Sequence, residues 1–487
     1  MSKVRSVFGA LLAAEIIWWA FFCFSTSVLP DEGYFHMRQA THIRETGFPL
    51  LHDNLSYGGR DFIVLPLFDY FIAFFSLFVE MIQAVKIASF FLIISIMILV
   101  FLVSNIITGN TTSALFSTAL SGMAPSIIYN FSSSSLLGVV LSLALIFLIS
   151  ESVTKTNIVL LGALLLALIL SSSLYFVFIL SILLYIFFIK IEGIKHTIGE
   201  LELVLCAVFI GAWGSMILFR DAIFLNGSAA LFGNVPQQIR TQLPTAVSLA
   251  FSIGLIPFIT GIYATFNYVF IKRNKPIYLC VSLLLVSFFL ASLSMLPVKE
   301  GIILASFLFC ILSSFVWRDF FFWVEKTKAS SFKTQIQLTF ILLIAVSGII
   351  VFSAETKIFY SSLSTKSDII AMNWMLANLL PNEKVMALYD EGNAITALSK
   401  HPVVIDSSFL LVKDPQEVFN DASIIFKTYE TESVRIMNTY NASILFFSER
   451  AQVSNPEPDY FSNKECFELL YNSKSQIYRS KCRWVES

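Results

Sequence analysis

The polar residues that could carry out chemistry are concentrated in segment 30–85, directly after the first long apolar stretch. Its opening run is Asp31-Glu32-Gly33-Tyr34-Phe35-His36-Met37-Arg38, and a later run is Asp53-Asn54-Leu55-Ser56-Tyr57-Gly58-Gly59-Arg60. Adjacent carboxylates beside a membrane-length apolar stretch are costly to keep without a task, and they can bind a divalent cation or act as a general base. Asp31 and Glu32 are therefore candidate catalytic residues. The alternative is that these acids only end the preceding helix at the interface.

Other side chains in the same segment suit a phosphorylated ligand. Arg38 and Arg60 carry the planar fork of N–H donors that matches phosphate, and Gly58-Gly59 permits a tight turn close to a ligand. Carboxylates, arginines and a glycine turn at a membrane surface favour a phosphorylated lipid as the substrate. Further candidate site residues in the segment are His36, Asp53, Tyr57 and Asp69.

Composition indicates the elements that must position these residues. Of 487 residues, 56% are hydrophobic and only 13% are charged, whereas a soluble protein carries about 25% charged residues. The 49 phenylalanines exceed the need of one water-soluble core, so the excess must face membrane lipids. The net charge of -1 and the absence of a basic run give no indication of a nucleic-acid partner.

The apolar pattern predicts a polytopic α-helical membrane protein. We expect about 11 transmembrane helices, near 6–29, 86–107, 111–128, 134–150, 157–173, 174–190, 201–219, 245–271, 276–296, 301–317 and 335–354. Segment 62–79 is interrupted by Pro66 and Asp69, which favours a re-entrant or interfacial helix. Lysine and arginine then gather on one side, so the N-terminus is predicted to be cytoplasmic and segment 30–85 extracytoplasmic.

The tail differs from the apolar part of the chain. We divide the chain into a transmembrane domain, 1–355, and an extracytoplasmic domain, 356–487, in which alternating helices and strands predict a small α/β fold. Cys466 and Cys482 flank a predicted hairpin in this tail. They form either a disulfide in an oxidising exterior or two unpaired thiols.

The first-loop runs resemble a known group of membrane enzymes. The order Asp-Glu-x-Tyr-Phe-His-Met-Arg at 31–38, Gly-x-Pro-Leu at 47–50, Asp53, and Leu-Ser-Tyr-Gly-Gly-Arg at 55–60 is similar to the first external loop of GT-C glycosyltransferases. The nearest match is to archaeal relatives of the oligosaccharyltransferase catalytic subunit. The tail supports the likeness through Met372-Asn373-Trp374 and the ending from 467 to 478.

The resemblance implies an activity and residue roles. Such enzymes transfer a sugar or glycan from a polyprenyl-phosphate carrier of the dolichyl type to an acceptor, here a protein, on the outer face. Asp31 would bind a divalent cation, Mg²⁺ or Mn²⁺, and orient the acceptor, with Glu32 beside it. Lys299 lies where the family places a basic residue for the carrier phosphate.

Three positions depart from the family pattern. Loop 129–135, Tyr-Asn-Phe-Ser-Ser-Ser-Ser, lacks the second acidic motif. Gln237 stands near an expected glutamate and is the second candidate metal ligand. Stretch 388–393, Leu-Tyr-Asp-Glu-Gly-Asn, replaces a Trp-Trp-Asp-Tyr-Gly motif that reads the acceptor. Its acids Asp390 and Glu391 are candidate substitutes for a missing acid.

These departures leave other functions open. One is an enzyme similar to protein O-mannosyltransferases, with a hydroxyl acceptor and Asp31 as base. Another is a non-catalytic membrane scaffold or lipid-binding relative, which the altered acidic motifs favour and the intact first loop opposes. A transporter is the third, but such proteins usually show paired repeats with broken helices, and the sequence has one interrupted segment.

Overall fold

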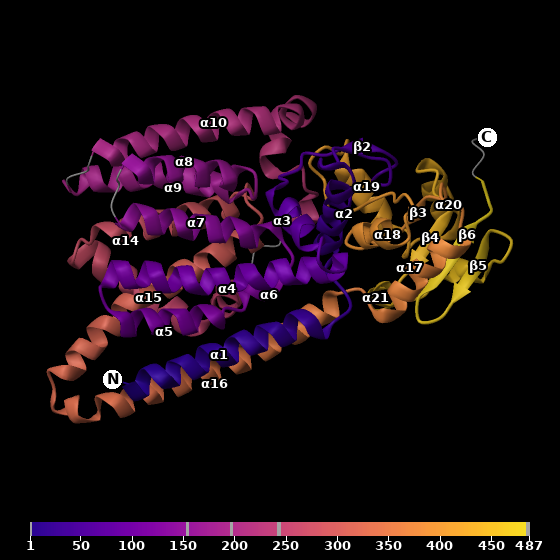
Figure 1. Ribbon diagram of the computed structural model, residues 1–487. Coiled ribbons are helices and arrows are strands. Elements are labelled where there is room, and N and C mark those ends of the chain that lie inside the picture. The colour runs from indigo at the N-terminus through magenta and orange to yellow at the C-terminus, as the bar shows by residue number, and fades with distance from the viewer. Residues whose placement is uncertain (1, 152–154, 195–197, 241–244, 484–487) are drawn as a thin grey trace. The chain divides into compact units, whose positions relative to one another are not determined.

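The chain folds into two units in the computed structural model, which describes residues 2–151, 155–194, 198–240 and 245–483 (Figure 1). Unit 1 consists of 1–25, 86–218 and 243–360, and unit 2 consists of 26–85, 219–242 and 361–487. Unit 2 thus combines the first loop with the tail. The predicted domain boundaries stay a prediction, and each unit is described by itself.

Unit 1 is built from helices that are apolar on nearly all sides, which is expected of helices with lipid around them. Their bounds are α1 (Ser2–Ser25), α4 (Met81–Thr108), α5 (Thr111–Gly122), α6 (Ser126–Tyr129), α7 (Ser134–Glu151), α8 (Lys155–Ile169), α9 (Leu174–Ile191), α10 (Ile198–Asn226), α12 (Ala246–Ile253), α13 (Leu255–Phe266), η2 (Asn267–Ile271), α14 (Lys275–Ser292), α15 (Val298–Glu325), η3 (Lys328–Phe332) and α16 (Lys333–Ser362).

Helix α15 is the centre of unit 1 and packs against α5, α13 and α14. Its buried Ser306, Ser313 and Ser314 donate hydrogen bonds to carbonyls of their own helix. Small side chains of this kind let neighbouring helices approach closely in a membrane. Helices α1 and α16 run side by side (Figure 1), joined by rings that include Trp18, Trp19 and Phe352.

Eight helices of the described part are long and apolar enough to cross a membrane, or nine if one bent pair is a single span. The chain is therefore an integral membrane protein, but the predicted count of 11 is not confirmed. Segment 111–128 contains α5, whose 12 residues reach only about 18 Å of a core about 30 Å thick. Segment 157–173 contains one short apolar helix, Val159–Ile169, and 245–271 bends by 102° between α12 and α13.

Unit 2 contains short helices and strands. They are α2 (Asp31–Thr46), β1 (His52–Asp53), β2 (Arg60–Asp61), α3 (Leu67–Phe75), η1 (Gly227–Phe232), α11 (Gln237–Arg240), α17 (Lys366–Asn378), β3 (Val385–Met386), α18 (Gly392–Leu398), α19 (Pro415–Ile424), α20 (Glu430–Thr439), β4 (Ile444–Phe447), α21 (Glu449–Ser454), η4 (Asp459–Ser462), β5 (Phe467–Asn472) and β6 (Gln476–Ser480). The nine residues of α3 are too few to cross a membrane.

Four strands of unit 2 form one sheet in the order β3-β4-β6-β5, with β3 and β4 parallel and the other pairs antiparallel. The four residues of β4 are all buried, as expected of a central strand covered on both faces. The core around the sheet includes Phe426, Phe447 and Phe461. Phe461 also stacks on Tyr478 with ring centroids 3.9 Å apart.

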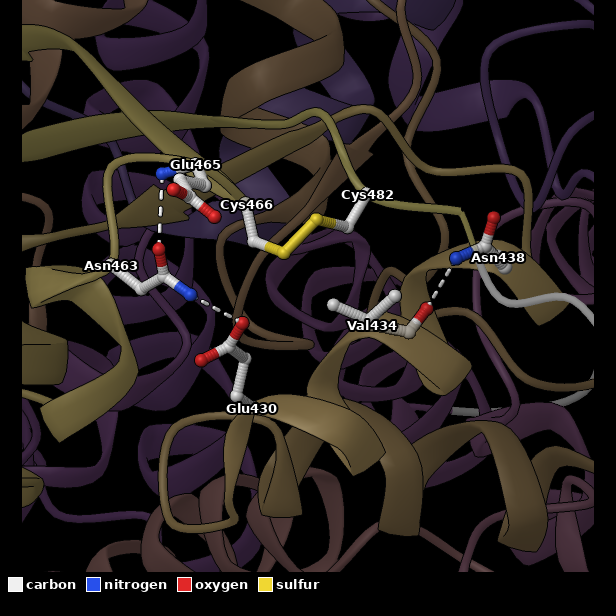
Figure 2. The surroundings of a disulfide bond; sticks show 7 residues. All are labelled: Glu430, Val434, Asn438, Asn463, Glu465, Cys466 and Cys482. Carbon is white, nitrogen blue, oxygen red and sulfur yellow. Dashed lines mark hydrogen bonds between the residues drawn. A yellow bond between two sulfur atoms is a disulfide. The ribbon is translucent and has the colours of Figure 1, made fainter.

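A disulfide joins Cys466 to Cys482 beside this sheet (Figure 2). Cys466 directly precedes β5 and Cys482 follows β6, so the bond closes the open end of the hairpin. Nearby, Asn463 donates a hydrogen bond of 2.7 Å to Glu430 at the start of α20. The structure thus decides between the two states that the sequence left open.

Candidate functional site

The two adjacent acids lie at the beginning of a helix. Helix α1 ends at Ser25, and α2 begins at Asp31 after Pro30, so the interpretation that the acids end the preceding helix is wrong. Carboxylates in a first turn are stabilised by the positive end of the helix dipole. Gly47 ends α2 in the left-handed region, with φ 82°, a conformation that costs glycine little.

The carboxylate of Asp31 is held by residues of the tail. Its Oδ2 accepts hydrogen bonds from Asn393 Nδ2 at 2.7 Å and from Ser407 Oγ at 2.9 Å. Its Oδ1 accepts one from the backbone N–H of Ala394 at 3.1 Å. A carboxylate can accept about four hydrogen bonds, so these three donors leave Oδ1 with room for one more.

The pKa of Asp31 is suited to proton transfer. Burial raises it to about 7, against the lowering effect of the hydrogen bonds from Asn393, Ser407 and Ala394. The nearby carboxylate of Asp406 raises it further. A general base works best when its pKa lies near the working pH, so Asp31 can accept a proton and release it again near neutrality.

Glu32 faces a buried ion pair. His36 Nδ1 lies 2.6 Å from Asp69 Oδ1, and His36 Nε2 lies 3.9 Å from Glu32 Oε1. Burial lowers the pKa of His36, but the carboxylates of Asp69 and Glu32 outweigh burial and raise the pKa to about 9. His36 is thus cationic at neutral pH, and the predicted site residues Glu32, His36 and Asp69 are brought together.

Both candidate arginines are engaged in ion pairs within unit 2. Arg38 Nη2 donates to Asp53 Oδ1 at 2.6 Å, and Arg38 Nη1 donates to Thr396 Oγ1 at 2.8 Å. Arg60 Nη2 lies 2.9 Å from Asp406 Oδ1. Both pairs are buried. These guanidinium groups therefore connect the first loop internally and to the tail, a role that the phosphate prediction did not include.

The contacts of Tyr57 and the glycine turn are also internal. Tyr57 donates a hydrogen bond of 2.9 Å to the carbonyl of Asp406. At Gly58, with φ 83°, a Cβ atom would lie 2.7 Å from Lys384 Nζ. Glycine is favoured here by this positive φ, a conformation in which any other side chain is strained, whereas the flexible end of the lysine could move aside.

The acids of stretch 388–393 pair with one arginine. Arg450 Nη2 lies 2.7 Å from Asp390 Oδ1 and 3.2 Å from Glu391 Oε1. Burial raises the pKa of Glu391 to about 8, although Arg450 acts against this rise. Glu391 Oε2 and Asn393 Oδ1 are buried, and neither has a hydrogen-bond partner among the described residues. Buried polar atoms in this state are uncommon and call for an explanation, and a catalytic role is one.

The remaining two predicted residues are Gln237 and Lys299. Gln237, the first residue of α11, is exposed, and its backbone N–H donates to Gln416 Oε1 at 2.8 Å. Lys299 belongs to unit 1, near the start of α15, and is exposed. Its carbonyl accepts a hydrogen bond from Asn130 Nδ2 at 3.2 Å, and Glu300 beside it accepts one from Ser173.

The described residues do not fit a divalent metal ion. They contain no group of three or more His, Cys, Asp or Glu residues that could hold one. Asp31 directs its oxygens at three hydrogen-bond donors, and such donors oppose a cation. We therefore derive no step through a metal.

Comparisons with known proteins bear on this arrangement. No model of a protein family and no curated protein matches the sequence. Solved structures do match. The apo oligosaccharyltransferase of Archaeoglobus fulgidus aligns with 98% of this chain and 74% of its own, at 11% identity and a TM-score of 0.67. Apo ArnT of Cupriavidus metallidurans aligns with 98% of both chains, at 12% identity and a TM-score of 0.60.

The chain has the GT-C fold. That fold belongs to membrane glycosyltransferases, as the first-loop resemblance implied. One matching structure is the archaeal enzyme AglB with an inhibitory peptide and a dolichol-phosphate, at 12% identity and a TM-score of 0.61, covering 91% of this chain and 69% of that one. At such identities the likeness establishes the fold, and the activity of this chain is a separate question.

Several residues that contact the predicted site residues were not predicted from the sequence. Asn393 was noted only as part of a motif, and Ser407, Asp406 and Arg450 were not singled out. Asp406 follows a short apolar run at 403–405, and polar residues at the end of a buried strand are frequent site residues. No comparable signal marks Arg450.

Proposed function

We propose that this protein transfers a sugar or glycan from a polyprenyl-phosphate carrier to an acceptor, on the extracytoplasmic face of the membrane. The observation that carries the proposal is the held carboxylate of Asp31 in a chain with the GT-C fold. Two of the matching structures contain a dolichol-phosphate or undecaprenyl phosphate. These lipids support a carrier of the same chemistry here.

In the proposed reaction, the acceptor's hydroxyl or amide gives its proton to Asp31. The acceptor's oxygen or nitrogen then attacks the anomeric carbon of the sugar. A new glycosidic bond forms while the bond to the carrier phosphate breaks, and the phosphate leaves with the electron pair of the broken bond. Asp31 contributes the base, and Glu32, held beside His36, adds negative charge next to the forming cationic sugar.

A protein acceptor remains part of the proposal. One matching structure holds an acceptor peptide tethered to the archaeal oligosaccharyltransferase, at 11% identity and a TM-score of 0.63, covering 91% of this chain and 69% of that one. The stretch 388–393 lacks the motif of that family, so a hydroxyl acceptor is the alternative. The disulfide of the tail supports an extracytoplasmic tail, because disulfides persist in oxidising surroundings.

Lys299 is the proposed cation for the leaving phosphate. Arg38 and Arg60 remain candidates only if phosphate displaces Asp53 and Asp406 from them, since both guanidinium groups are paired. Divalent cations occur in this chemistry, and one matching structure was solved with zinc and sulfate, at a TM-score of 0.62.

The test is consumption of lipid-linked sugar by the purified full-length protein in a lipid bilayer. The donor is the polyprenyl-linked sugar fraction extracted from membranes of the source organism, and the product measured is free polyprenyl phosphate. We expect wild type to consume donor and Asp31→Asn to reduce the rate at least 100-fold while donor binding persists. Donor that binds equally to both proteins and is never consumed would indicate a non-catalytic lipid-binding relative instead.

A further inference from the structure

The stretch that replaces the expected acceptor-reading motif is directed at Asp31. Asn393 ends the stretch 388–393, and its amide group donates hydrogen bonds to Asp31 Oδ2 at 2.7 Å and to Ser407 Oγ at 2.9 Å. Ser407 in turn donates to the same Oδ2 at 2.9 Å. The three side chains form a closed set of hydrogen bonds, in which each contacts the other two.

This set joins segments that are distant in sequence. Asp31 precedes Asn393 by 362 residues and Ser407 by 376. Hydrogen bonds to a carboxylate are about twice as strong as those between neutral groups. Two donors on one oxygen, with a third from Ala394 on the other, fix both the position and the rotation of the carboxylate.

One polar atom of this set of three side chains makes no hydrogen bond within the described structure. Asn393 is 1% exposed, and its Oδ1 has no hydrogen-bond partner among the described residues. An asparagine kept only to stabilise the fold is expected to satisfy both ends of its amide. Ser407 is exposed, so the set reaches from the interior of unit 2 to its surface, where an acceptor can arrive.

We infer that Asn393 and Ser407 are positioning residues that hold Asp31 for proton transfer. This inference rests on the proposed function. On this inference the stretch 388–393 positions the carboxylate of the base, and it does not select the acceptor by the acceptor's sequence. A base displaced by about 1 Å from its working position loses about 100-fold in rate, so the loss of one donor changes the chemical step more than substrate binding.

The test uses full-length variants in bilayers, with donor consumption as the assay. Ser407→Ala removes one donor at an exposed position, where little stability is lost. We expect kcat to fall about tenfold with the KM for the extracted donor unchanged, and Ser407→Thr to restore the rate. Asn393→Asp keeps the shape of the side chain but replaces the donor by an oxygen that repels Asp31, and we expect a fall of at least 100-fold.

Two matched controls separate positioning from folding. Ser423→Ala removes a hydroxyl that donates only to the carbonyl of Phe419 within α19. Asn438→Leu removes an amide that donates to the carbonyl of Val434 within α20 (Figure 2). Both should consume donor at the wild-type rate, and the two Ser407 variants and both controls should keep the wild-type unfolding temperature within a few degrees.

The outcomes distinguish this inference from the proposed function. If wild type is active and both Ser407→Ala and Asn393→Asp retain its kcat, positioning by the tail is refuted and the transferase stands. A rise in KM at constant kcat also refutes it, because that result assigns these side chains to substrate binding. If wild type consumes no donor, the proposed function fails, and the inference fails with it.

Discussion

The buried pair of Arg60 and Asp406 allows a quantitative test of what the first-loop arginines do. Their side chains are 7% and 1% exposed, and the charged groups are 2.9 Å apart. Ser56 also donates to Asp406, and the guanidinium lies 4.2 Å from the ring centroid of Phe62. Asp406→Asn therefore leaves a buried guanidinium without its counter-charge.

The expected loss follows from the penalty for an unpaired buried charge. Removing one partner of such a pair costs about 3–5 kcal/mol of folding free energy. Since each 1.4 kcal/mol is a factor of about ten, opening of unit 2 should become about 100- to 4,000-fold more frequent. Amides of the buried strand β4 exchange with solvent through such opening.

Hydrogen exchange with mass spectrometry on the full-length protein in a bilayer measures this change directly. In Asp406→Asn, peptides covering 444–447 should exchange faster by the factor above. The double variant Arg60→Met, Asp406→Leu should recover most of the protection, because a well-packed apolar pair of similar volume replaces a buried ion pair at little loss. The matched control is Glu432→Gln, which breaks the exposed pair with Arg435 and should cost less than about 1 kcal/mol.

An exchange rate for Asp406→Asn that matches the control would refute this reasoning. It would mean that Arg60 does not depend on Asp406 in the folded protein, as expected of an arginine that serves mainly to bind phosphate. The reasoning would also be contradicted if the β4 amides lost as much protection from hydrogen exchange in the double variant as in the single variant. The stabilising contribution would then come from the particular hydrogen bonds of the pair.

Three further predictions concern pH, the disulfide and metal. Because the pKa of His36 is raised, its pairing with Asp69 contributes its full stability below about pH 6.5, and this contribution is lost as the pH rises through about 9. The unfolding temperature of wild type should therefore fall between these two pH values. A His36→Gln variant whose unfolding temperature falls by the same amount would contradict the pairing. Replacement of Cys466 by serine opens a loop of about 16 residues and should lower the free energy of unfolding by about 3 kcal/mol. Hydrogen exchange in peptides covering 467–480 should then be faster. If a reductant leaves the exchange of these peptides unchanged in wild type, the disulfide contributes nothing to stability. Because hydrogen-bond donors occupy Asp31, EDTA should leave donor consumption unchanged, and recovery of a lost rate by Mn²⁺ but not by Ca²⁺ would show that a metal site forms when substrate binds.

The sequence by itself determined the membrane class of the protein, its fold and where its polar residues gather. Long runs without charge cannot fold in water, so they predict transmembrane helices regardless of tertiary detail. The first-loop motif indicated the GT-C fold, because residues that suit one chemistry at a fixed spacing are visible in a linear sequence. In the tail, the hairpin predicted between Cys466 and Cys482 corresponds to the antiparallel strands β5 and β6.

Only the tertiary structure decided which of these polar residues meet. Breaks in the apolar helices depend on bends such as the one of 102° at Gly254, which hydropathy averages hide. Asn393, which binds Asp31, and Asp406, which pairs with Arg60, lie more than 340 residues from their partners, and a sequence carries no sign of such pairings without knowledge of the packing. Arg38 and Arg60 have the right side chains for phosphate, yet burial beside Asp53 and Asp406 commits them to ion pairs. The chemistry that a residue type can perform is predicted from the sequence. Which partner that residue contacts depends on distances that only the folded structure sets.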